Sequence, residues 1–201
     1  TKNAGFACFG SIAELEQDLQ AMGAERTVKL VLKRYSGLQL LRQMLGDKAI
    51  DYREVGGYEL CFKAPNQERI NFFNDLLEPA LGQRPYSVVG NSDFGFSADV
   101  QCMIKNTLEG TVDTGKMIGA LQRQVGMSGV QTFTQSTVKE IKDGANGKTV
   151  HVQTANGPVD LKAEKVALCT NAFSKDFFPE ADMQPGRGMV LVTKPNPAFN
   201  W

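Results

Sequence analysis

The chain has 201 residues, 42% of them hydrophobic, which is enough to bury a core in one domain or two small ones. Its 22 basic and 22 acidic side chains cancel, so charge gives no reason to expect a nucleic acid or an anionic membrane surface as a partner. No apolar run approaches the roughly 18 residues of a membrane span, and no signal-peptide pattern is present.

The cysteines are far apart in the sequence and form no C-x-x-C pair, so no zinc or dithiol motif is legible and no metal site is predicted. Reduced thiols in a cytoplasmic protein are the simplest interpretation. The four residues are Cys8, Cys61, Cys102 and Cys169.

The first ten residues are small and contain two glycines, which permits close approach of the backbone to a bulky group; the alternative is a simple loop before a helix. A capping box, Ser11-Ile12-Ala13-Glu14, then predicts a helix that Gly23 ends. Apolar residues at helical spacing predict a second helix over residues 24–45, with a possible bend at Ser36-Gly37.

Residues 52–62 are typical of an extended segment, and Asn66 caps a predicted helix that runs to Leu81. The aromatic and leucine side chains of that helix either line a site or face the core, and their helical spacing favours the core. The segment 85–99 has no clear pattern, and a short strand is predicted over 100–104.

Asp113 caps a predicted helix that runs to Val125 and leads into a β-rich segment. Alternating residues predict strands at 129–133, 137–141 and 149–154, with Asp-Gly and Asn-Gly turns between them. Val166 to Cys169 is a continuous apolar run, which favours a strand covered on both faces.

The predicted fold class is therefore α/β, or mixed α+β. A helix, a strand, a β-meander and a return strand form the closing half of a nucleotide-binding unit in which a small sheet is the crossover. The G-x-G-x-x-G turn of the opening half does not occur, and Gly115-Lys116 is not a P-loop. We expect the chain to be an internal piece of a longer protein.

Four segments in order resemble the D-amino-acid oxidase-like family of FAD-dependent oxidoreductases, which includes glycine oxidase and sarcosine oxidase. Asn3-Ala4-Gly5-Phe6 is similar to the loop after the second Rossmann strand, and Thr137-Val138 to the segment that meets the adenine. The other two segments are Cys169 to Ser174, similar to the family's C/A-T-G-x-W/Y-S turn, and Gln184 to Met189, similar to its P-G-R-G-Q strand entry.

The resemblance implies that the intact protein binds FAD and oxidises a small amine or amino acid by hydride transfer to the flavin. Residues 1–50 and 105–180 would belong to a partial Rossmann-like FAD-binding domain, and residues 51–104 and 181–201 to an antiparallel-sheet substrate domain. Because the first half of the FAD domain is missing, we expect the 201-residue chain alone to be colourless and inactive.

By the same resemblance, cofactor-binding residues are expected in three places. Lys2 would supply a positive charge near the flavin, Arg187 would pair with a substrate carboxylate, and no catalytic residue is predicted. Two departures from the family pattern are Asn171, where glycine is usual, and Met189, where glutamine is usual; asparagine adopts the left-handed region readily. The expected cofactor-binding residues are Lys2, Asn3, Ala4, Gly5 and Phe6 at the flavin, Val138 at the adenine, and Thr170, Asn171 and Ala172 at the diphosphate and ribitol.

Other candidates for chemistry are less specific. The single histidine, His151, is either a general base or, as its place in a strand favours, a solvent-facing residue. Cys169 is either a nucleophile or a buried inert thiol, and the predicted apolar strand favours the second. A non-catalytic binding module that keeps this scaffold is the alternative function, and an NAD-dependent dehydrogenase is less favoured because the meander crossover is typical of flavin-type folds.

Overall fold

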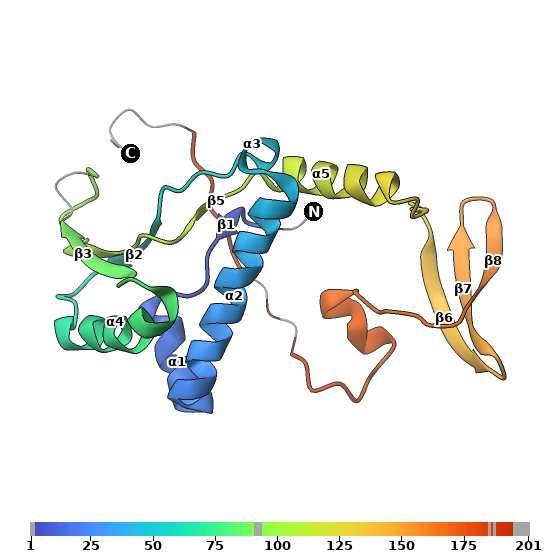
Figure 1. The fold of residues 1–201 in the computed structure, drawn as a ribbon, viewed down its shortest axis with the longest axis horizontal. Coiled ribbons are helices and arrows are strands. Elements are labelled where there is room, and N and C mark those ends of the chain that lie inside the picture. Colours follow the sequence, from blue (N-terminus) through green and yellow to red (C-terminus); the bar gives the residue numbers. More distant parts are fainter. Residues whose placement is uncertain (1–2, 91–93, 185, 187, 195–201) are drawn as a thin grey trace. The chain divides into compact units, whose positions relative to one another are not determined.

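The structure is a computed structural model that describes residues 3–90, 94–184, 186 and 188–194 (Figure 1). It divides into two compact units, residues 1–128 with 192–201 and residues 129–191, and each is described by itself. Lys2 and Arg187 lie outside the described residues.

The helices of the first unit follow the predicted capping signals. Ser11 accepts a hydrogen bond from the Glu14 backbone and completes the capping box, while Asn66 and Asp113 each accept from the third residue of their helix. The predicted helices are confirmed. They are α1 (Ile12–Met22), α2 (Ala24–Leu45), α4 (Gln67–Leu81) and α5 (Thr114–Met127), together with the short α3 (Asp47–Ile50).

Two antiparallel sheets belong to this unit. The larger has the order β2-β4-β3, with strands Gly57–Cys61, Cys102–Asn106 and Tyr86–Gly90; the last lies in the segment that the sequence left unassigned. The smaller pairs β1 (Phe6–Ala7) with β5 (Gly110–Thr111).

The main core forms where α1, α2 and α4 pack against one another and α4 lies on β3 (Figure 1). The predicted inward face of α4 is confirmed, because Ile70, Phe73 and Leu77 are fully buried. In α2 the most buried positions are Thr27 and Val31. The remaining members of this core are Phe9, Ile12, Leu15, Tyr86, Ile104 and Leu108.

The second unit contains an antiparallel meander, β6 (Thr137–Gly144), β7 (Gly147–Thr154) and β8 (Gly157–Ala163), as Figure 1 shows. Its turns lie where the Asn-Gly pairs predict them: Gly147 and Gly157 have φ of 131° and 114°, in the region that favours glycine. A 3-10 helix, η1, follows at Asn171–Asp176.

Two predicted strands of this unit are absent from the described structure. Residues 129–133 and 166–169 have no strand conformation, and Val130 and Phe133 are exposed. Cys169 is exposed as well, so the prediction of a buried thiol is wrong. A strand between two others needs hydrogen-bonding neighbours, and no described strand pairs with either segment.

Candidate functional site

A cleft of about 650 Å³ lies in the first unit, lined by residues of β1, β2, β4 and β5 and of the loop 8–11. Its volume is typical of a small-molecule site, about 300–1,000 Å³. Aromatic side chains form part of its wall: Phe6 lies on β1, and Tyr58 packs against Phe94 with ring centroids 5.3 Å apart. A smaller hollow at the β6–β7 turn has no aromatic lining, so the cleft is the better candidate for a ligand site.

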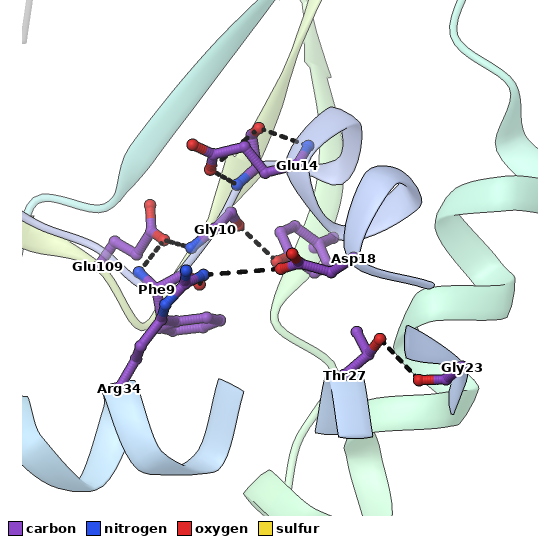
Figure 2. Close-up of polar contacts among 10 residues, drawn as sticks. Phe9, Gly10, Glu14, Asp18, Gly23, Thr27, Arg34 and Glu109 are labelled. Atoms are coloured by element: carbon purple, nitrogen blue, oxygen red, sulfur yellow. Dashed lines mark hydrogen bonds and ion pairs between the residues drawn. The ribbon is translucent and has the colours of Figure 1, made fainter. Parts of the chain in front are cut away.

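Three carboxylates that line the cleft hold the loop leading into α1, and Figure 2 shows two of them, Glu14 and Glu109. Glu109 accepts hydrogen bonds from the backbone N–H groups of Phe9 at 2.9 Å and Gly10 at 3.3 Å. The next two N–H groups along the chain bond to the other carboxylates: Ser11 donates to Glu14 at 2.9 Å and Ile12 donates to Glu59 at 3.2 Å.

Two carbonyl groups of the same loop are also paired. The hydroxyl of Tyr86 donates to the Gly10 carbonyl at 2.8 Å, and Arg34 donates to the Phe9 carbonyl at 3.1 Å while lying 3.8 Å from Asp18, as Figure 2 shows for Arg34. Because these donors and acceptors are bound by side chains, most of them from distant parts of the chain, this loop is a preorganised wall of the cleft.

The electrostatics of the cleft follow from this arrangement. Glu109 is only 7% exposed, and burial raises its pKa above the ordinary value, while the Phe9 and Gly10 N–H groups lower the pKa and the charge of Glu14 raises it. Burial also raises the pKa of Glu59. The Cys8 thiol lines the cleft too, and burial together with Glu109 raises its pKa, which disfavours the nucleophilic thiolate.

One member of the first group of predicted cofactor residues, Phe6, lines this cleft. The side chain of Asn3 accepts from the Gly5 backbone at 2.8 Å, and Gly5 has a φ of 81°. A Cβ at Gly5 would come within 2.8 Å of the Val112 carbonyl oxygen, so only glycine fits there. Phe6 lines the cleft and is 64% exposed, and Ala4 is exposed.

The second group lies in the other unit. Val138 is on β6 opposite Val152, and Thr170 precedes η1, with its hydroxyl 3.0 Å from that of Ser174. Asn171 has a φ of 49°, in the left-handed region expected for it. The convergence of Val138, Thr170, Asn171 and Ala172 with the Asn3–Phe6 loop stays a prediction.

The sequence as a whole identifies the family of the chain. The family profile described as "FAD dependent oxidoreductase" matches residues 2–200. The chain belongs to this family of FAD-dependent oxidoreductases. No curated protein sequence matches the chain.

Solved structures are similar to this chain. L-proline dehydrogenase from P. horikoshii matches with a TM-score of 0.51 and 17% identity over 72% of this chain and 38% of its own. Glycine oxidase from Geobacillus kaustophilus has a TM-score of 0.50 and 17% identity over 86% of this chain and 45% of its own. Glycine oxidase from Bacillus cereus ATCC 14579 has a TM-score of 0.48 and 22% identity over 81% of this chain and 42% of its own. The chain therefore spans less than half the length of each.

The family is FAD-dependent, which implies FAD as the cofactor of the intact protein. The described residues of the Asn3–Phe6 loop fit such a group. Small side chains at Ala4 and Gly5 leave the main chain accessible, and the exposed ring of Phe6 offers an apolar surface at the edge of the cleft.

Sequence reasoning missed Glu109 and Glu59. Their importance comes from contacts with residues about 100 and 47 positions away, which no local pattern reveals. The sequence feature that could have pointed to Glu109 is its position between Leu108 and Gly110, next to residues typical of a strand. Glu14 was found, because its capping box is local.

The single histidine belongs to the second unit. His151 lies on β7, and its Nδ1 is 2.5 Å from the carboxylate of Asp160 on β8, so it is partly covered by a cross-strand partner. Among the described residues, no group of three or more His, Cys, Asp or Glu side chains is placed to hold a metal ion. None of the described helices is both long and apolar enough to cross a membrane.

Proposed function

We propose that the intact protein oxidises an amine or an amino acid, and that the cleft forms part of its substrate site. The observation that carries this proposal is the position of Phe6, which belongs to the loop that the family resemblance assigns to the flavin and also lines the cleft. A substrate in the cleft would then lie beside the cofactor. The matched structures, a glycine oxidase and an L-proline dehydrogenase, are named for amino-acid substrates and support the same class.

Bound FAD would supply the redox chemistry by accepting a hydride from the substrate carbon that bears nitrogen. The residues of this chain would bind and orient the substrate. The rings of Phe6, Tyr58 and Phe94 would cover its apolar part and exclude water. The described acidic side chains that line the cleft are Glu14, Glu59 and Glu109, and in their ionised form they favour a cationic amine.

The remaining expectations from the resemblance belong to the same proposal. Asn3, Ala4 and Gly5 would lie beside the flavin, Val138 by the adenine, and Thr170, Asn171 and Ala172 near the diphosphate and ribitol. Lys2 would favour the reduced flavin and Arg187 would pair with a substrate carboxylate. The division into FAD and substrate domains at 1–50 with 105–180 and 51–104 with 181–201, and the cytoplasmic location, are proposed with them.

The test is anaerobic titration of the intact protein while its flavin absorbance is recorded. We expect glycine, D- or L-amino acids or simple amines to bleach the flavin, and 2-hydroxy acids to leave it oxidised. Bleaching by 2-hydroxy acids alone would contradict the amine class while keeping the redox function. A purified intact protein without flavin would favour the non-catalytic binding module instead.

A further inference from the structure

Two cysteines face each other in the sheet that lines the cleft. Cys61 ends β2 and Cys102 begins β4, and the register of these antiparallel strands pairs them directly. The same ladder starts at the pair Gly57 and Asn106, both of which line the cleft. The thiol pair therefore lies at the opposite end of the two strands from the cleft.

The backbone geometry of such a pair suits a disulfide. Directly opposite residues of an antiparallel ladder have Cα atoms about 4.5–5.5 Å apart and side chains on the same face. A disulfide needs Cα atoms about 4.4–6.8 Å apart. Cys102 is buried and Cys61 packs against the main core, so both side chains are directed to the same protein interior. Both thiols are free in the structure.

The strand ends allow the small adjustment that a bond requires. Opposite Cβ atoms lie about 4.5–5.5 Å apart in a ladder, slightly more than the roughly 3.5–4.5 Å of a disulfide. Cys61 is the last residue of its strand, and Cys102 is flanked on the other side by Gly90, the last residue of β3. Glycine has no side chain to resist movement of its neighbour.

We propose that Cys61 and Cys102 are a modification site, at which a hydroperoxide forms a reversible disulfide. One thiol attacks the peroxide, becomes a sulfenic acid and releases water or an alcohol. The second thiol then attacks the sulfenic sulfur and forms the disulfide. The displaced hydroxide takes the proton of that thiol and leaves as water. The two sulfurs together lose two electrons and two protons, and the hydroperoxide accepts both.

The protonation state of Cys61 affects how readily the bond forms. Burial and the neighbouring Cys102 raise the pKa of Cys61 to about 11, so this thiol carries its proton near neutral pH. Since the thiolate is the reactive form, Cys61 stays reduced at low peroxide and reacts faster as the pH rises. The expected response is to oxidative stress rather than to trace oxidant.

Oxidation would fix the strands that line the cleft. The bond would close the chain segment between Cys61 and Cys102, which contains α4 and β3, and would hold β2 and β4 in their present register. The cleft residues on the same two strands, Gly57 and Asn106, would keep their alignment. This inference does not depend on which substrate the cleft binds.

The test is mass mapping of the intact protein after treatment with hydrogen peroxide at pH 7 and pH 9, alkylation of free thiols, and trypsin digestion without reduction. Cleavage after Lys and Arg places Cys61 in peptide 54–63 and Cys102 in peptide 70–105, because Arg84 precedes Pro85. We expect these two peptides joined, faster at pH 9, and separated again by a dithiol. Alkylation of both residues at the highest peroxide that leaves the fold intact would overturn the proposal.

Matched variants locate the bond. Cys61→Ser and Cys102→Ser are each expected to abolish the joined peptides, while Cys8→Ser and Cys169→Ser leave them unchanged. Oxidation should also raise the thermal unfolding midpoint of the wild-type protein and of the Cys8→Ser variant, but not that of Cys61→Ser. Joined peptides that contain Cys8 or Cys169 in place of either partner would contradict the assignment.

Discussion

The two compact units use their apolar residues differently. In the first unit three helices and a sheet bury side chains completely, as at Leu15, Phe73 and Met103. In the second unit Val150 and Val152 are buried on the central strand, while Val159 and Leu161 on β8 stay more than two-fifths exposed. A meander can keep its register through hydrogen bonds and Asn-Gly turns, whereas a buried polar loop requires a packed core around it. The cleft and its buried carboxylate accordingly lie in the first unit.

The largest expected effect tests this difference in packing. Phe73→Ala should lower the free energy of unfolding of the first unit by about 3–5 kcal/mol, because it opens a cavity in a close-packed core. Val159→Ala in the second unit removes a half-exposed side chain and should cost under about 1 kcal/mol. Hydrogen exchange resolved to peptides measures both. Equal losses would contradict the contrast between the units.

The next effect compares two hydrogen-bonded carboxylates. Glu109→Ala leaves the buried N–H groups of Phe9 and Gly10 without acceptors and should cost about 1–3 kcal/mol for each group left unpaired. Asp160→Ala removes an exposed partner of His151 and should cost under about 1 kcal/mol. Glu109→Gln retains an acceptor oxygen and is the control for the first variant. Denaturant unfolding of the three variants gives the comparison.

Glu109 should also make the stability of the protein depend on pH. Because the pKa of Glu109 is raised in the folded state, the folded protein holds this proton where the unfolded chain has lost it. Its contribution to stability is complete below the unfolded pKa, about 4.5, and is lost as the pH rises through the folded pKa. Glu59 acts in the same direction, so the difference between the wild type and Glu109→Gln isolates Glu109. An identical pH profile of unfolding in both proteins would contradict the burial assigned to this carboxyl group.

The smallest effect concerns local hydrogen bonds. Ser11→Ala removes the cap of α1 and should cost about 0.5–2 kcal/mol. Ser136 in the second unit donates to the carbonyl of Thr134, two residues away, and Ser136→Ala should change stability by less than about 0.5 kcal/mol. Thermal unfolding of the two variants compares them. A larger loss at Ser136 would show that the second unit depends on its turns more than on its ladder.

The parts of this fold that the sequence predicts are those set by neighbouring residues. Ser11, Asn66 and Asp113 cap the predicted helices, and the Asn-Gly pairs place the turns of the meander. The strands expected at 129–133 and 166–169 are absent from the described structure because a strand depends on partners that its own sequence does not contain. Cys169 is exposed for the same reason.

The residues of the candidate site likewise divide into those that the sequence predicted and those that it did not. The family resemblance assigned Asn3 to Phe6 to the flavin from a short local sequence, and the structure shows Phe6 in the cleft lining, while the contact with flavin stays a prediction. Glu109 was missed because its role depends on Phe9 and Gly10, roughly half the chain away. The Cys61–Cys102 pair was likewise invisible until the register of β2 and β4 was known.

The most direct test of the central claim compares two phenylalanines of the first unit in the intact protein. Phe6 lines the cleft and Phe62 does not, although their exposures, 64% and 63%, are nearly equal. Phe6→Ala should raise the amine concentration that half-saturates flavin reduction by about tenfold or more, the equivalent of about 1.4 kcal/mol of lost apolar contact. Phe62→Ala should leave it unchanged; equal effects of the two substitutions would contradict the assignment of the cleft as the substrate site.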